Sequence, residues 1–209
     1  MSRKLVLILA LGMITNGAKS LTAEDCGNDP LARQLAQLIQ AHPQQQRQTI
    51  QCSAKLSAIA AIKAGHIHAN EDIWHHAGRM APNQLLRHHG FQLPPTYPMF
   101  GNQVEALAGG EETVQQVLTD FLNSKPHRML LLGEDAFFRE QDQIGVAYLN
   151  DPATNHQHYW VVIIATEKKN SVKQDPVIEV EPPVISKKKR KRGEIRERHY
   201  RNRVKRQWN

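Results

Sequence analysis

The stretches QIGVAYL (Gln143–Leu149) and HYWVVIIAT (His158–Thr166) decide the fold class. Both are rich in valine, isoleucine, tyrosine and tryptophan, which favour extended backbone. Asn150-Asp151-Pro152 and a few further polar residues separate them, a spacing typical of two strands joined by a turn. The sequence therefore predicts a β-hairpin at the end of the folded part.

Upstream of this hairpin, apolar residues recur at helical spacing between recognisable start and stop signals. The first predicted helix begins at Asp29-Pro30 and ends at Pro43, and the second begins at Ser53 and ends at Gly65. A third spans Pro82–His89. A fourth begins at Glu111-Glu112 and runs past Phe121, and a fifth spans Arg128–Leu132. Helices first and a hairpin last predict an α+β fold rather than repeated βαβ units. The sequence has no internal repeat and no glycine-rich phosphate loop, so nucleotide binding lacks its usual sequence support.

The charge of the chain is unevenly distributed. The 209 residues carry a net charge of +7, but Lys187–Asn209 holds 12 basic and 2 acidic residues, whereas Glu24–Ser186 holds 12 basic and 18 acidic ones. The body is therefore acidic and the tail is basic. With 40% apolar residues, the body is long enough for one hydrophobic core. Two cysteines exclude a disulfide-dense miniprotein and a four-thiolate zinc site.

The N-terminus resembles an export signal. Basic Arg3 and Lys4 precede the apolar stretch Leu5–Ile14, and a polar segment ends at Ala23. We therefore expect residues 1–23 to be a signal peptide, cleaved after Ser20 or Ala23, and residues 24–167 to form the domain of a periplasmic or extracellular protein. The alternative is a buried first helix.

Export makes the cysteine pair interpretable. Cys26 and Cys52 flank the first predicted helix, and disulfides persist in oxidising compartments. We expect them to form a disulfide that stabilises the fold by roughly 3 kcal/mol. The alternative is two unpaired thiols.

Chemistry-bearing residues are concentrated in several segments. The chain has 11 histidines, most of which we expect at the surface. Five segments follow one another in a characteristic order: WHHAGR (Trp74–Arg79), GNQVEALAGG (Gly101–Gly110), FLNSKPHRMLL (Phe121–Leu131), IGVAY (Ile144–Tyr148) and HYWVV (His158–Val162). This order resembles the bacterial SCP-like branch of the CAP superfamily, which also contains cysteine-rich secretory proteins, antigen 5 and plant pathogenesis-related proteins. The resemblance covers most of the body.

The resemblance implies an α-β-α sandwich with a central antiparallel sheet and a cleft lined by histidine and glutamate. Carried onto this chain, the cleft residues are His76, Glu105 and His127, with His75 as a competing register for the first. Two imidazoles and a carboxylate suffice to hold Zn²⁺ or another divalent cation with an open position. The alternative is a buried hydrogen-bond network that braces the cleft without metal. Where many relatives carry a second glutamate, this chain has Ser124.

A hydrolase would also need a nucleophile. The cysteines are better explained as a disulfide, and the sequence has no Gly-x-Ser-x-Gly elbow. Ser124 lies three residues before His127, but we expect it to cap the helix that follows. We therefore favour a non-catalytic binding module, with a metal-assisted hydrolase acting on peptide or cell-wall material as the alternative.

Two further features indicate partners. Trp74, Tyr97, Met99 and Phe100 could line an apolar groove for a small lipid or peptide, although such residues are more often core. In the tail, residues 168–209, a basic run repels itself and is expected to be disordered. We expect it to bind an anionic envelope polymer or lipid surface, with nucleic acid less favoured. The run consists of Lys187, Lys188, Lys189, Arg190, Lys191 and Arg192.

Overall fold

The computed structural model describes residues 26–168, so the predicted signal peptide and the tail beyond Lys168 lie outside the described residues. The helices are α1 (Pro30–Gln40), α2 (Ala54–Asn70), α3 (Pro82–His88), α4 (Val114–Asn123), α5 (Lys125–Leu132) and α6 (Ala136–Arg139). The strands are β1 (Gln51–Cys52), β2 (Glu105–Gly109), β3 (Gln143–Asn150) and β4 (His158–Ala165). These elements confirm the α+β class. No helix within residues 26–168 combines the length and apolar character needed to cross a bilayer.

The four strands form one sheet in the order β1-β3-β4-β2. The predicted hairpin is confirmed, because β3 and β4 pair antiparallel from Gln143 opposite Ala165 to Asn150 opposite His158. Strand β2 joins the other side of β4, also antiparallel. The sheet departs from the expected antiparallel pattern at β1, a two-residue strand that runs parallel to β3.

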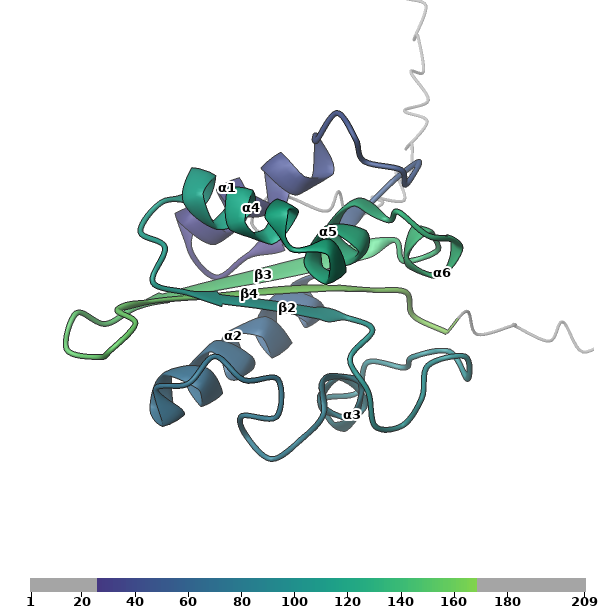
Figure 1. Cartoon of the computed structure of the whole chain (residues 1–209). Helices are drawn as coiled ribbons and strands as arrows, with labels where there is room; N and C mark the ends of the chain where they lie inside the picture. The colour runs from purple at the N-terminus through teal and green to yellow at the C-terminus, as the bar shows by residue number, and fades with distance from the viewer. Residues whose placement is uncertain (1–25, 169–209) are drawn as a thin grey trace, which may run out of the picture. The chain divides into compact units, whose positions relative to one another are not determined.

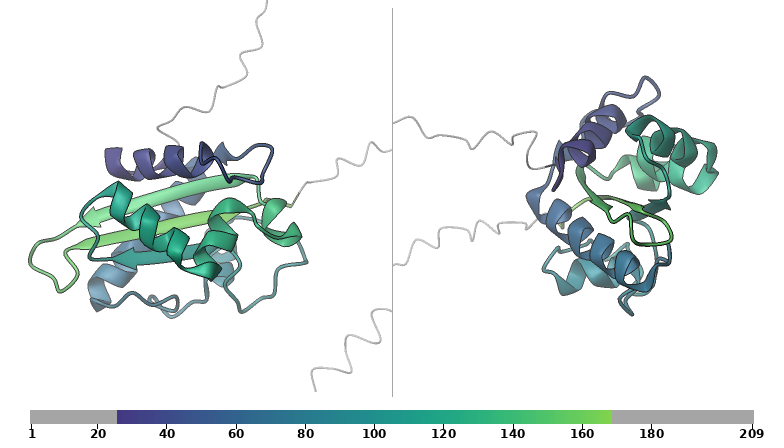
Figure 2. Two further views of the ribbon diagram at one scale, coloured as in Figure 1. Left: turned by 45° about the horizontal axis from the view of Figure 1, so that its top comes forward. Right: turned by 90° about the vertical axis from the view of Figure 1, so that its left-hand side faces the viewer.

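Helices cover both faces of the sheet, as the predicted sandwich requires (Figure 1 and Figure 2). Helices α1, α4 and α5 lie on one face, and α2 and α3 lie on the other. Strand β4 separates the two cores by the alternation of its side chains. Tyr159, Val161 and Ile163 pack on the α2 side, whereas the residues between them pack on the α1 and α4 side. Burial on both faces explains why β4 reads as a continuous apolar run.

The predicted disulfide between Cys26 and Cys52 is present. It connects the segment before α1 to β1, and Cys26 is fully buried against the α1 side of the sheet. The bridge therefore fixes the edge of the sheet to the start of the described chain. Because disulfides persist in oxidising compartments, the bridge is typical of an exported protein.

The predicted end of the second helix is wrong. Helix α2 continues through Gly65 to Asn70, and Glu71 adopts the left-handed conformation that terminates it. Ala64 and Ile67 on either side of the glycine belong to the buried face, so tertiary packing outweighs the cost of about 1 kcal/mol for glycine in a helix. The later helices follow the prediction more closely: Ser124 stands at the N-cap of α5, as expected, whereas α4 begins at Val114 rather than at Glu111.

Candidate functional site

The site is built around Glu105, the first residue of edge strand β2. Asn102 in the preceding turn holds the backbone of Glu105 at both ends: its Oδ1 accepts from Glu105 N at 2.9 Å, and its Nδ2 donates to Glu105 O at 2.9 Å. An asparagine side chain that closes such a turn fixes where the strand begins. It also sets which face of the strand the Glu105 side chain occupies.

The Glu105 carboxylate is buried and pairs with a histidine. Glu105 is 1% exposed, and its Oε1 lies 2.9 Å from Nδ1 of His75. For this ring nitrogen to donate to an ionised carboxylate, Nδ1 must carry the proton. Within the described residues, Oε2 of Glu105 is buried with no hydrogen-bond partner. The Glu105 carboxylate therefore orients His75 through Oε1 and leaves Oε2 without a hydrogen bond.

Lys63, a buried lysine on α2, binds the loop between α2 and α3 that carries His75. Lys63 is 0% exposed, and its Nζ donates to the backbone oxygens of Trp74 (3.1 Å), His75 (2.6 Å) and Ala77 (3.1 Å). The same Nζ lies 3.8 Å from Oε1 of Glu105. Burial lowers the pKa of Lys63, and the charge of Glu105 opposes that shift. Lys63 thus acts on both members of the His75–Glu105 pair.

Helix α5 supplies the opposite wall. The ring of His127 packs edge-on against the ring of Phe121, at 5.2 Å between centroids. Burial lowers the pKa of the His127 imidazole from its usual 6.5, and the positive charge of protonated His75 lowers it further. Neutral imidazole is therefore the favoured form of His127 near neutral pH.

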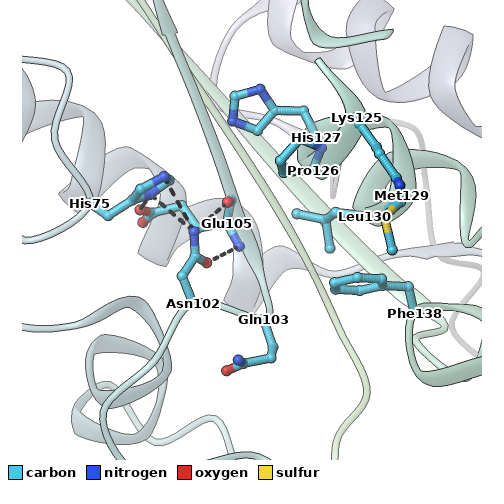
Figure 3. Close-up of a pocket in the computed structure, with 10 residues that line it drawn as sticks. All are labelled: His75, Asn102, Gln103, Glu105, Lys125, Pro126, His127, Met129, Leu130 and Phe138. Carbon is cyan, nitrogen blue, oxygen red and sulfur yellow. Dashed lines mark hydrogen bonds and ion pairs between the residues drawn. The ribbon is translucent and has the colours of Figure 1, made fainter. Parts of the chain in front are cut away.

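Between these walls lies a pocket of about 390 Å³ (Figure 3). One side is polar, with His75, Asn102 and Glu105, and the other is formed by α5 together with Phe138 from α6. The complete lining is His75, Asn102, Gln103, Glu105, Lys125, Pro126, His127, Met129, Leu130 and Phe138. The pocket can therefore hold a small molecule with an apolar body and a polar head.

The predicted site residues are only partly brought together. Glu105 and His127 line the pocket, and so does His75, the competing register. His76 is absent from the lining; it is exposed, and its ring lies 5.3 Å from that of Trp74. Ser124 is at the N-cap of α5, but its side chain makes no capping hydrogen bond, so the predicted capping bond is wrong. Ser124 does not line the pocket either.

The predicted metal ligands do not form a ligand set in the part of the chain that the structure describes. Across residues 26–168, no group of three or more His, Cys, Asp or Glu side chains is placed to hold an ion. The carboxylate of Glu105 instead faces His75 and the ammonium group of Lys63. This arrangement resembles the bracing network expected as the alternative, and metal binding stays a prediction.

The four residues expected to line an apolar groove lie apart from this pocket. Tyr97 belongs to the core and its hydroxyl accepts from Gln141. Trp74, Met99 and Phe100 are exposed, at 56%, 55% and 74%. None of the four lines the pocket. The apolar wall comes instead from α5 and α6.

Sequence reasoning missed two residues of the site. Lys63 interrupts the apolar run of α2, and a lone charge on a buried helix face is a signal for a buried ion pair. Asn102 follows Gly101, and adjacent glycine and asparagine residues are typical of a turn. Both signals are present in the sequence, but neither reveals its partner.

No family model and no curated protein matches the chain. Among solved structures, an outer surface protein from Borrelia burgdorferi is similar, with 23% sequence identity and a TM-score of 0.47. The match covers 65% of this chain and 88% of that protein.

Proposed function

We propose that this protein is an exported, non-catalytic binding module that takes a small ligand in the pocket between β2 and α5. The observation that carries the proposal is the contrast between the two walls. Leu130, Met129 and Phe138 offer an apolar surface, and they face the hydrogen-bonded pair of His75 and Glu105. Pockets of this size and composition are typical of small-molecule sites.

A binding role agrees with the chemistry of the lining. The residues that line the pocket include no serine, threonine or cysteine that could act as a nucleophile. His75 is instead held in one orientation by Glu105, which suits a hydrogen bond to a ligand. A fixed polar group beside an apolar wall confers orientation as well as affinity.

Ligand binding can be tested with a small neutral probe. Benzyl alcohol should shift the methyl resonances of Leu130 and Met129 in NMR spectra of the full mature chain. A tryptophan in place of Met129 should fill the pocket and abolish these shifts at Leu130. Ala58→Trp is the matched control, because Ala58 is exposed on α2 and away from the pocket lining. Shifts that persist in Met129→Trp, or that never reach Leu130, would contradict the proposal.

The competing function is a metal-assisted hydrolase. His75, Glu105 and His127 are the residues of the pocket that could contribute ligands, and bound Zn²⁺ would supply an activated water. Zinc calorimetry, followed by assays on peptide and cell-wall substrates with and without zinc, tests this alternative. A zinc-dependent rate that is lost in His127→Ala would favour the hydrolase over the binding module.

The proposal extends to the basic tail, which lies outside the described residues. We propose that the run Lys187–Arg192 binds anionic lipid or envelope polymer and so retains the exported domain at a surface. Binding to anionic vesicles should be strong at low salt, fall steeply with ionic strength and be lost in a chain that ends at Ser186. Equal binding by the intact and shortened chains would refute the tether. Membership of the CAP superfamily stays a prediction.

A further inference from the structure

We infer that Lys63 determines the charge preference of the pocket, so that it accepts a small carboxylate in preference to a cation of the same shape. This inference rests on the proposed function, because it names the chemical class of the ligand. Lys63 does not line the pocket itself. Lys63 acts through Glu105 and through the loop that carries His75. It is therefore a specificity-determining residue that does not contact the ligand.

The contacts of Lys63 favour the charged ammonium form of its side chain. Its Nζ lies between 2.6 and 3.1 Å from three backbone oxygens, those of Trp74, His75 and Ala77. Carbonyl oxygens only accept, so three such bonds require three N–H donors. A neutral amine has two, whereas an ammonium has three. This geometry therefore favours a positive charge on Lys63, which is 0% exposed, and the nearby Glu105 carboxylate favours it as well.

This charge compensates the one acid of the pocket. Glu105 is the only Asp or Glu among the lining residues, and its Oε1 lies 3.8 Å from the Lys63 ammonium and 2.9 Å from His75 Nδ1. At such distances, away from water, a pair of opposite charges cancels at longer range. A cationic ligand therefore meets a carboxylate whose attraction is already offset.

The remaining charge on the lining is positive. Lys125 stands at the first position of α5 and lines the pocket next to His127. Figure 3 shows the Lys125 side chain on the α5 wall, across from Glu105. Gln103 and Asn102 complete the polar lining and are neutral. A carboxylate head group is favoured here, with its apolar body against Leu130.

The test uses two probes of nearly the same shape and opposite charge. Benzoate and benzamidine are both flat rings with a forked head group, and their dissociation constants can be measured by NMR titration at the methyl groups of Leu130 and Met129. The experiment uses the full mature chain at neutral pH and low salt. Reading the shifts at these two residues separates pocket binding from binding to the basic tail.

In the wild-type protein, benzoate should bind roughly tenfold more tightly than benzamidine. Lys63→Met should reduce this ratio roughly tenfold, since the charge of Glu105 is then exposed to the ligand. Glu105→Gln should raise the ratio, because the lysine charge is no longer compensated. Lys55→Met, on the same helix and away from the pocket lining, should leave the ratio unchanged.

Several results would overturn the inference. Benzamidine binding as tightly as benzoate in the wild type would do so, and so would an unchanged ratio in a folded Lys63→Met variant. If Lys63→Met does not fold, the wild-type ratio and its rise in Glu105→Gln still decide the matter. Failure of the proposed function is distinguishable, because benzyl alcohol would then also leave the Leu130 and Met129 resonances unmoved.

Discussion

Replacing Lys63 by methionine should destabilise the fold strongly. Methionine approximates the length of the lysine stem but removes the ammonium group, which leaves the buried Glu105 carboxylate without its cation and three backbone oxygens without their donor. Removal of one partner from a buried ion pair costs about 3–5 kcal/mol. We therefore expect the free energy of unfolding to fall by about that amount.

Urea unfolding followed by circular dichroism measures this loss, and α2 offers a matched control. Lys55 pairs with Glu167 at 2.9 Å, but their side chains are 46% and 35% exposed. Lys55→Met should therefore cost at most about 1 kcal/mol. The double variant Lys63→Met, Glu105→Gln should lose less than the sum of its single variants, because the two groups interact directly. A cost for Lys63→Met no larger than that for Lys55→Met would exclude a stabilising role for the buried ammonium group.

The stability of the fold should also depend on pH, on the packing of α2 against β3 and on the disulfide. The folded state lowers the pKa of His127 below its unfolded value near 6.5. The stability that comes from neutral His127 is therefore fully present above pH 6.5 and is lost as the pH falls through the folded pKa. His75→Ala should raise the pKa of His127, and NMR titration of its ring protons checks this; an unchanged pKa would exclude an electrostatic link between the two rings. Gly145→Ala should destabilise the protein by about 2 kcal/mol or more, because the new Cβ would overlap the backbone of α2. Gly65→Ala has open space around it and should add up to about 1 kcal/mol of stability. Similar denaturation midpoints for the two variants would contradict the packing of α2 on β3. Reduction of the disulfide should lower the free energy of unfolding by about 3 kcal/mol, and a calorimetric scan unaffected by reductant would contradict this.

The secondary structure was predictable where the local signal and the tertiary packing agree. The hairpin strands are rich in β-branched and aromatic residues, and their packing on both faces of the sheet requires the same residues. At Gly65 the local signal for a helix end conflicts with the tertiary packing, and the buried residues after it extend α2 to Asn70. Strand β1 could not be predicted, because two residues carry no periodic pattern.

The site was predictable only in part, for a physical reason. Glu105 and His127 were expected from the resemblance to the CAP superfamily, and both line the pocket. His75 and His76 lie between α2 and α3 in irregular backbone, where adjacent side chains have no fixed alternation. Three hydrogen bonds from Lys63 set that backbone, and the sequence does not reveal which carbonyls a buried lysine will reach.

The most direct test of the pocket as a ligand site is a crystal of the protein soaked in 4-iodobenzoate. Iodine scatters anomalously, so its position can be located without assumptions about the ligand. We expect a peak within the pocket, with the ring against Leu130 and Phe138 and the carboxylate directed toward Lys125 and His75. An empty pocket, or iodine found only elsewhere on the molecule, would contradict it.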